Sequence, residues 1–235
     1  MSSPLWQQWQ AQCQSRGLPV SDALLARFGQ LYALLLDANK TLNLTRITDP
    51  ADFLNRHILE GLLLTAHIPQ NARVGDVGSG GGFPALPMAL LRPDITVTAI
   101  EAVGKKCRFI EATAEALQLQ NVQTLSLRSE DMARDTQYRE GFDVLTARAV
   151  AALPVLLEMT VPLLKPQGVL LALKGSRYPE EVAGSHNALK LLSAEIITTE
   201  ENFSGGDGAL LVIQKKATTL AAYPRKGGLI RKNPL

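Results

Sequence analysis

A run of glycines between Asp76 and Pro84 is the part of the sequence best suited to hold a ligand. The run Asp76-Val77-Gly78-Ser79-Gly80-Gly81-Gly82-Phe83-Pro84 joins a strand-like segment, 73–77, to a helical segment, 84–91. Glycine lets a ligand touch bare backbone and adopts positive φ at little cost. The helix start would also present free N–H groups to an anionic part of the ligand. The pattern therefore predicts a ligand site rather than a merely flexible loop.

The glycine pattern by itself leaves two cofactors open. The segment Gly80-Gly81-Gly82-Phe83-Pro84-Ala85 also fits the G-x-G-x-x-A form of dinucleotide sites. Asp76 favours S-adenosylmethionine, because methyltransferases place an acid before the first glycine, where it can hold the methionine ammonium, often through water. Glu101 lies 19 residues after Gly82 at the end of the next expected strand, where a carboxylate accepts hydrogen bonds from ribose hydroxyls. This second acid predicts a nucleoside without choosing between the two cofactors.

Further polar residues follow the next strands of the expected sheet. Ser129 and Glu130 come after the third strand, where this fold usually meets adenine, although a helix cap would also explain them. Arg148 follows the fourth strand, close to the transferred methyl, with a surface ion pair as the alternative. His57 is a lone histidine on a leucine-rich segment and is interpreted as structural rather than catalytic.

The elements that position these residues alternate between strands and helices from residue 73 onward. We expect strands near 73–77, 95–101, 122–127, 142–147 and 168–174, and helices near 84–91, 105–118, 153–164 and 179–192. This alternation is typical of a parallel sheet with crossover helices. The runs 196–199 and 210–213 are joined without a helix, which predicts an antiparallel hairpin. The sequence thus predicts an α/β fold of the class I (Rossmann-like) methyltransferase type, with a mostly parallel twisted sheet and a C-terminal antiparallel hairpin.

The rest of the chain is divided into two flanking parts. Residues 1–70 are expected to form a helical extension packed on the core domain, 71–216; leucines and a phenylalanine recur there at helical spacing from Asp22 to Asp37. Ser21 is available as the N-cap of that helix. Residues 217–235 are expected to form a basic C-terminal tail.

Composition and charge narrow the class of protein. The chain has 235 residues, of which 46% are hydrophobic and 20% charged, as in globular proteins. We expect a cytoplasmic monomer with no membrane partner, because no signal-like start or membrane-length apolar run is present. Cys13 and Cys107 lie far apart and predict neither a disulfide nor a metal site.

The charge is unevenly distributed along the chain. Residues 215–235 contain six basic residues and no acid, and removing those six charges from the formal net charge of +2 leaves −4 for the remainder. A basic tail on a mildly acidic body indicates a polyanionic partner. A frayed, solvated end is the alternative.

In their order and spacing these motifs resemble the bacterial RsmG (GidB) methyltransferases, over nearly the whole chain. The matching segments are Asn39–Thr45, His57–Glu60, Asp76–Pro84, Glu101 with Lys105 and Lys106, Arg128–Glu130, Ala147–Ala149, Ala172–Gly175 and Tyr223–Gly228. The chain departs from the usual family residues at Ala38, Glu60, Gly61, Ala85 and Ile230. These departures affect the expected RNA contacts more than the expected cofactor site.

The resemblance implies a function and a set of site residues. The family methylates N7 of a guanine in small-subunit (16S) ribosomal RNA, so the implied cofactor is S-adenosylmethionine and the implied partner is that RNA or the 30S subunit. Cofactor contacts are expected from Asp76, Gly78, Ser79, Gly80, Phe83, Glu101, Ser129, Glu130 and Arg148. RNA contacts are expected from Lys105, Lys106, Arg128, Lys174, Arg225, Lys226, Arg231 and Lys232. Arg148 is expected to orient the reaction, and no general base is expected because N7 carries no proton.

Other functions stay open at this point. A methyltransferase of another RNA would have the same cofactor site. So would a methyltransferase of a protein or a small molecule, but that would leave the basic tail without a purpose. A nicotinamide-dependent dehydrogenase fits the glycine run but not Asp76 or the terminal hairpin. A non-catalytic RNA-binding module could retain the whole fold.

Overall fold

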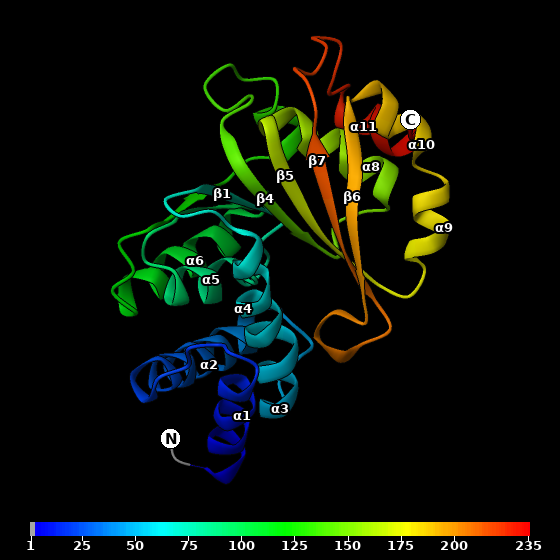
Figure 1. Cartoon of the computed structure of the whole chain (residues 1–235). Coiled ribbons are helices and arrows are strands. Elements are labelled where there is room, and N and C mark those ends of the chain that lie inside the picture. Colours follow the sequence, from blue (N-terminus) through cyan, green and yellow to red (C-terminus); the bar gives the residue numbers. More distant parts are fainter. Residues whose placement is uncertain (1–2) are drawn as a thin grey trace.

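A seven-stranded sheet forms the centre of the molecule, which is known from a computed structural model that describes residues 3–235 (Figure 1). Its strands are β1 (Arg73–Val77), β2 (Thr96–Ile100), β3 (Val122–Leu125), β4 (Phe142–Arg148), β5 (Leu164–Lys174), β6 (Ala194–Glu201) and β7 (Ala209–Lys215). The strand order is β3-β2-β1-β4-β5-β7-β6. Strands β1 to β5 are parallel, and β7 runs antiparallel to both of its neighbours. The predicted parallel sheet with an antiparallel hairpin is confirmed.

The helices follow the expected alternation, with two local differences. They are α1 (Pro4–Ser15), α2 (Asp22–Leu42), α3 (Pro50–Asp52), η1 (Phe53–Leu59), α4 (Glu60–Leu64), η2 (Thr65–His67), α5 (Ala85–Leu91), α6 (Gly104–Ala116), α7 (Ser129–Met132), α8 (Leu153–Thr160), η3 (Val161–Leu163), α9 (Tyr178–Ala183), α10 (His186–Leu191), η4 (Phe203–Gly205) and α11 (Gly227–Lys232). The single helix expected over 179–192 is two helices, because α9 ends at its C-cap Gly184. The helix expected over 153–164 ends at Thr160, and a 3-10 turn leads directly into β5.

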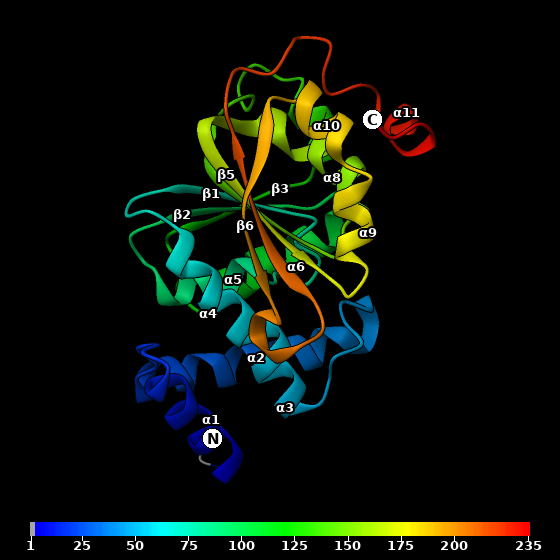
Figure 2. The same cartoon turned by 45° about the vertical axis from the view of Figure 1, so that its right-hand side comes forward.

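The sheet is covered on both faces, and its strands alternate between two hydrophobic cores (Figure 2). Leu171 and Leu210 face the core that is shared with α1, α2, α4, α5 and α6. Their neighbours Leu170 and Leu211 face the opposite core, which is shared with α8 and α10. The period of two along each strand explains this division, since successive side chains point to opposite faces.

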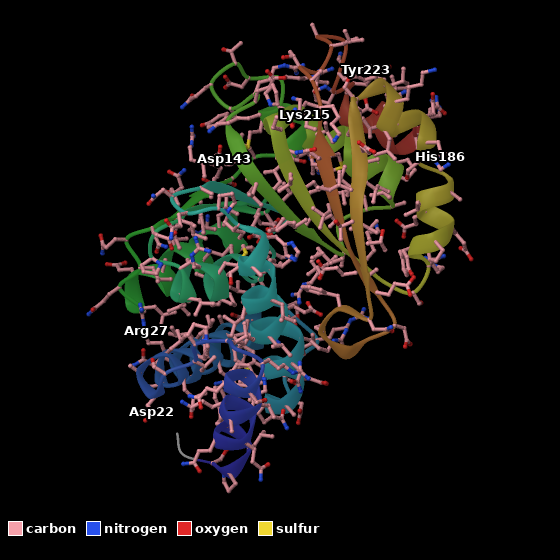
Figure 3. All side chains as sticks on the ribbon, in the orientation of Figure 1. Asp22, Arg27, Asp143, His186, Lys215 and Tyr223 are labelled. Carbon is pink, nitrogen blue, oxygen red and sulfur yellow. The ribbon has the colours of Figure 1, made fainter. Side chains whose placement is uncertain are left out.

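The N-terminal helices pack against the same core as α5 and α6. Ser21 caps α2, as expected, by accepting a hydrogen bond from the Leu24 amide. Arg27 on α2 donates to the carbonyl of Leu117, just beyond the end of α6, and Figure 3 shows its side chain between the two helices. Phe28 is fully buried in the shared core. The helical extension is therefore continuous with the sheet domain.

The basic tail is folded against the sheet domain, so the alternative of a frayed, solvated end is wrong. Arg139 donates to the carbonyls of Thr219 and Tyr223 at 2.8 Å. Figure 3 labels Tyr223 beside the end of β7 that carries Lys215. Ile230, on α11, is fully buried against Val155 and Met159 of α8.

Within residues 3–235, no helix is long and apolar enough to cross a membrane.

Candidate cofactor site and substrate cleft

The glycine loop folds over the end of β1 at the point where the strand order reverses. Strand β1 lies between β2 and β4. The strands that follow it in sequence are added first on one side of β1, as β2 and β3, and then on the other side, from β4 onward. Open α/β sheets bind ligands at such a reversal of strand order. Gly78 and Ser79 donate from their amides to the carbonyl of Ile100, at 2.8 and 3.2 Å. Gly78, Gly80 and Gly82 have φ values of 70°, 59° and 85°. The loop therefore needs glycine at alternate positions, as its sequence predicted.

Asp76 is buried beneath the glycine loop. Its carboxylate is 1% exposed and accepts hydrogen bonds from the hydroxyls of Ser79 and Thr146, and from the amide of Ala85. Burial raises the pKa of Asp76, and these hydrogen bonds lower it in part. The side chain thus fixes the glycine loop from below and lines neither cavity. A contact with the methionine ammonium through water stays a prediction.

Two amides at the start of α5 have partners within the protein. The Ala85 amide is used by Asp76, and the Leu86 amide donates to the carbonyl of Gly82 at 2.8 Å. The helix is a short one of seven residues. Its first turn closes on the loop that precedes it and leaves these two amide groups without capacity for a ligand.

Glu101 lies where the sequence placed it, at the end of β2. Its two carboxylate oxygens accept hydrogen bonds from the amides of Gly80, at 3.0 Å, and Val103, at 2.9 Å. Each oxygen keeps a second lone pair directed away from the backbone. The side chain lines a cavity of about 150 Å³ together with Gly78 and Ser129. A carboxylate held in this way suits the two hydroxyls of a ribose.

Glu130 forms the opposite side of this cavity, which we call the nucleoside pocket; it is lined by Val77, Gly78, Ile100–Ala102, Leu127–Glu130, Val150, Met159 and Arg231. The Glu130 side chain is 2% exposed and accepts hydrogen bonds from the Ser129 hydroxyl, at 3.4 Å, and from Arg231, at 3.1 Å. Ser129 and Glu130 are also the first two residues of α7. The two residues therefore lie at a helix start and line the pocket at the same time. Two carboxylates facing one pocket match the hydroxyl and amine donors of adenosine.

A second and larger cavity, of about 1250 Å³, adjoins the nucleoside pocket and is called the substrate cleft. Its walls are residues 45–47, 55–57, 60, 148–152, 173–177, 181 and 203–209. Val150 lines both cavities, and a Cβ added at Gly78 would lie 2.8 Å from its side chain. In both Figure 1 and Figure 2 the hairpin loop between β6 and β7 reaches the N-terminal helices, which places it across the cleft. The two cavities therefore meet at Gly78 and Val150.

Arg148 stands in the substrate cleft and is held by the segment that precedes β1. Its guanidinium donates to Glu60 Oε2 at 2.9 Å, to His57 Nδ1 at 2.9 Å and to the carbonyl of Arg56. The Arg148 side chain is 23% exposed, so one part of the guanidinium still faces the cleft. Arg148 does form an ion pair, with Glu60, but two further groups, His57 and the carbonyl of Arg56, also fix the orientation of its side chain.

His57 is buried, as a structural histidine would be, but it contacts the site. Burial, together with the nearby charges of Arg148 and Arg56, lowers the pKa of His57 to about 3, so the ring is neutral at physiological pH. Because Arg148 donates to Nδ1, the proton is on Nε2, which lies 3.1 Å from the hydroxyl of Thr45. Sequence reasoning missed this contact, since 91 residues separate the two side chains.

Phe83 is packed in the core, and its expected cofactor contact stays a prediction. Its side chain is 4% exposed and lines neither cavity. The ring stacks on His57, with centroids 4.2 Å apart and an interplanar angle of 11°, and its other neighbour is Phe53. It supports the histidine that contacts Arg148.

Two of the residues expected to contact RNA form ion pairs within the protein. Lys174 has a 7% exposed side chain that pairs with Glu181 at 2.5 Å. Arg225 pairs with Glu158, whose side chain is fully buried. In each case a buried or half-buried acid neutralises the charge, so these two residues offer less attraction to RNA than unpaired ones would.

The remaining basic residues divide into two groups. Lys105, Arg128, Lys226 and Lys232 are exposed, Lys106 is half-buried, and Arg231 is exposed but bound to Glu130. Sequence analysis did not single out Arg46, Arg56 and Arg177, which are exposed and line the substrate cleft. Within residues 3–235 none of these three arginines forms an ion pair with an acid. These three arginines are far apart in sequence, and only the fold shows that they line the same cleft; we call them the rim of the substrate cleft.

The fold has close matches among solved structures. An S-adenosylmethionine-dependent methyltransferase from Aquifex aeolicus superposes with a TM-score of 0.55 at 19% identity, over 73% of this chain and 96% of that one. The TYW2 protein of M. jannaschii, solved in complex with AdoMet, superposes with a TM-score of 0.53 at 18% identity, over 67% of this chain and 74% of that one. The fold and the paired carboxylates define a class I S-adenosylmethionine-dependent methyltransferase.

The sequence comparison narrows this class to one family. The family model described as GidB, rRNA small subunit methyltransferase G, matches residues 24–205. The "Ribosomal RNA small subunit methyltransferase G" of Desulfitobacterium hafniense is 40% identical over 225 residues, which cover 94% of each chain. The chain belongs to the GidB family. S-adenosylmethionine is its cofactor, and the nicotinamide alternative is thereby excluded.

Proposed function

We propose that this protein transfers a methyl group from S-adenosylmethionine to N7 of a guanine in small-subunit ribosomal RNA, with the base bound in the substrate cleft. The observation that carries the proposal is the position of Arg148. It lies in a cleft of about 1250 Å³ that meets the nucleoside pocket at Gly78 and Val150. The family description and its relatives' names supply the ribosomal RNA, and the chemistry of the cleft supports N7.

The groups around Arg148 favour a nucleophile that has no proton to lose. Both ring nitrogens of His57 are engaged, and Glu60 accepts from Arg148 and from Ser204. None of these groups is free to act as a general base. Guanine N7 carries an exposed lone pair and no proton, so its methylation needs alignment rather than proton transfer. An exocyclic amine would require a proton acceptor that these residues do not offer.

S-adenosylmethionine, when bound, supplies an electrophilic methyl group on a sulfonium centre. Gly78, Glu101, Ser129 and Glu130 would hold its adenosine in the nucleoside pocket, since these residues provide the open backbone and the acceptors. The glycine loop would direct the remaining part toward Val150. N7 gains the bond to the methyl carbon, the bond to sulfur breaks with its electron pair, and the positive charge passes to the guanine.

Arg148 has the donors needed to orient this base. A guanidinium has five N–H groups, and three hydrogen bonds hold it to the protein. The remaining donors match the O6 acceptor beside N7, because arginine contacts that edge of guanine in nucleic-acid complexes. A bond to O6 alone fixes the plane of the base and leaves the N7 lone pair free.

The rim of the cleft provides positive charge for the RNA backbone. Arg46, Arg56 and Arg177 surround the opening and have no acidic partners among residues 3–235. Phosphate contacts of this kind position an RNA without reading its sequence. The cleft-side arginines, rather than the folded tail, are the main RNA contacts in this proposal.

The test uses purified protein, labelled S-adenosylmethionine and 30S subunits that lack the modification, followed by mapping of the methylated base. We expect N7-methylguanine in the small-subunit RNA. Arg148→Ala should lower kcat by at least about 100-fold, as is common when an orienting group is lost, and Arg148→Lys should recover little because it lacks the planar fork. Arg16→Ala, an exposed residue in neither cavity, is the matched control. A label on another atom would overturn the N7 assignment, and full activity of Arg148→Ala would overturn its role.

The rim is tested separately through the salt dependence of RNA binding. Each of Arg46→Ala, Arg56→Ala and Arg177→Ala should weaken binding and reduce the slope of log affinity against log salt by roughly one. Cofactor affinity should not change in these variants. Lys190→Ala removes an exposed lysine outside both cavities and should leave the slope unchanged. Equal slopes in all four variants would show that the RNA does not contact this rim.

A further inference from the structure

We propose that the C-terminal segment 224–232 is a wall of the cofactor site, and that Arg231 holds the nucleoside pocket closed over bound adenosine. The inference concerns the cofactor and does not depend on which RNA atom is methylated. It changes the role of a segment whose basic residues predicted an RNA-binding arm. Its support comes from the anchoring of the segment, its contacts with the pocket and the size of that pocket.

The segment is anchored to the sheet domain by a buried ion pair. The backbone amide and the Nε of Arg225 both donate to Glu158 Oε1 at 2.8 Å, and Arg225 NH2 donates to Oε2 at 2.6 Å. Glu158, on α8, is fully buried. A carboxylate in such a place is costly unless its hydrogen bonds are satisfied. The partners of Glu158 come from the C-terminal segment, so the burial of this acid requires the segment to stay docked.

A hydrophobic contact fixes the following turn. Ile230 is fully buried against Val155 and Met159 of α8, and Figure 1 shows α11 beside that helix. Met159 also lines the nucleoside pocket. The same side chain therefore separates the docked helix from the place where adenosine would lie. Movement of α11 away from α8 would open this wall.

Both ends of α11 contact one pocket carboxylate. Arg231 NH1 donates to Glu130 Oε1 at 3.1 Å, and Arg231 is itself a lining residue of the pocket. At the other end, a Cβ added to Gly227 would overlap the Glu130 carboxylate, so the backbone there lies directly against it. Glu130 is 2% exposed because of this cover. The Arg231 side chain is 48% exposed, which leaves it able to swing outward.

The pocket is small for its ligand. Its volume is about 150 Å³, whereas sites for ligands of this size measure roughly 300 to 1,000 Å³. Adenosine needs more room than this, so part of the lining must move on binding. The half-exposed Arg231 side chain is a part of the lining that can do so. The contact between Arg231 and Glu130 closes one side of the pocket. Its opening would admit the cofactor, and its return would slow the cofactor's release.

The first test compares two adjacent glycines of α11. Gly227→Ala places a methyl group against the Glu130 carboxylate, and Gly228→Ala places the same group in open space. Both changes have the same effect on helix propensity. Titration with S-adenosylhomocysteine should show about tenfold weaker binding for Gly227→Ala, equivalent to 1.4 kcal/mol, and wild-type binding for Gly228→Ala. Equal affinity in the two variants would overturn the proposal.

The second test separates the two basic residues at the end of the helix. Arg231→Ala should raise the dissociation rate of S-adenosylhomocysteine by about tenfold, and Arg231→Lys should restore part of the loss. Lys232→Ala removes an exposed charge that makes no contact with Glu130, and should leave the rate unchanged. The melting temperature of each unliganded variant should match that of the wild type, which distinguishes a pocket effect from loss of folding.

RNA binding in the absence of cofactor decides between the wall and an RNA arm. The wall predicts that Arg231→Ala binds unmodified 30S subunits as tightly as the wild type and releases S-adenosylhomocysteine faster. An RNA arm predicts weaker 30S binding with an unchanged rate of release. The second result, or tighter cofactor binding in Arg231→Ala, would overturn the inference.

Discussion

Arg148 owes its position to residues that are distant in sequence. His57, Glu60 and the carbonyl of Arg56 all belong to the helical segment before β1, and they hold the guanidinium through three hydrogen bonds. The π-helical geometry of η1, which contains Arg56 and His57, has hydrogen bonds of i→i+5 type and often marks a functional site. The neutral ring of His57 is part of this arrangement because only an unprotonated Nδ1 can accept from Arg148.

The depressed pKa of His57 predicts a pH dependence of stability. The folded value is about 3 and the ordinary value is 6.5, so the unfolded chain binds a proton here that the folded chain refuses. The free energy of unfolding should therefore fall as the pH decreases from about 6.5 toward 3. His57→Gln should lack that part of the decrease, on the order of a few kcal/mol in total.

Urea unfolding of both proteins at pH 7.5 and pH 5.0 measures the difference. The wild type should lose more stability on acidification than His57→Gln, since His67 and His186 are common to both. A similar loss in the two proteins would contradict a neutral, buried His57. The variant's methyl transfer at pH 7.5 should also fall, because the orientation of Arg148 depends on this ring.

The sequence predicted the positions of site residues best where those residues follow the end of a strand. Glu101, Ser129, Glu130 and Arg148 lie at the carboxyl edge of the sheet in the cavities that their positions indicated. The environment of a side chain was not predictable in the same way. Burial turned Asp76 inward, because its neighbours on β4 and the glycine loop supply donors that no local pattern reveals.

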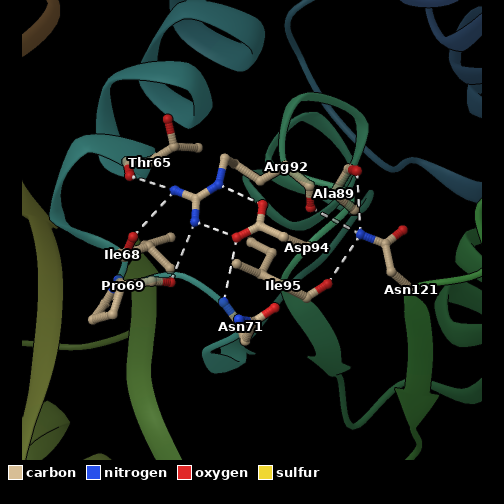
Figure 4. A network of polar contacts seen from close by, with 9 residues as sticks. All are labelled: Thr65, Ile68, Pro69, Asn71, Ala89, Arg92, Asp94, Ile95 and Asn121. Carbon is tan, nitrogen blue, oxygen red and sulfur yellow. Dashed lines mark hydrogen bonds and ion pairs between the residues drawn. The ribbon is translucent and has the colours of Figure 1, made fainter.

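Among the elements, the end of the helical extension is joined to the start of β2 by a polar network (Figure 4). Arg92 donates to the carbonyls of Thr65, Ile68 and Pro69, at 3.2, 3.1 and 3.3 Å. Its other donors bind Asp94 at 2.6 and 2.7 Å. These carbonyls end the segment that carries His57, so the network fixes the approach of that segment to the sheet.

Arg92→Lys tests this network at the level of the elements it joins. A lysine keeps the charge but cannot donate in three directions from one plane, so we expect a loss of about 1–3 kcal/mol in the free energy of unfolding. Arg16→Lys, at the exposed end of α1, is the control and should change little. An unchanged urea midpoint for Arg92→Lys would show that the carbonyls are satisfied without it.

The bounds of helices and strands were predictable from sequence to within a few residues. Local irregularities within helices and the docking of α11 were not. Strand and helix periods survive in a single sequence because they reflect which face is buried. The π-helical turn at η1 and the break at Gly184 depend on tertiary contacts. The docking of α11 was missed for a similar reason, since Arg231 and Glu130 are 101 residues apart.

At the scale of the whole molecule, an aromatic chain links the first helix to the site. Trp6 on α1 lies 6.3 Å from Phe53 between ring centroids, Phe53 lies 6.0 Å from Phe83, and Phe83 stacks on His57. Arg148 is the next contact. All four rings lie at or beside the core that the N-terminal helices share with the sheet. The extension is thus part of the support for the substrate cleft and not a separable domain.

This continuity predicts that the extension and the sheet unfold together. Both tryptophans of the chain, Trp6 and Trp9, are in α1, so their fluorescence reports the extension, while far-UV circular dichroism reports all helices and strands. The two urea curves should coincide in a single transition. Leu35→Ala, at a fully buried position of α2, should shift both curves together by about 2–5 kcal/mol. An early fluorescence transition, with the dichroism of the sheet domain retained, would instead show that the helical extension folds as an independent unit.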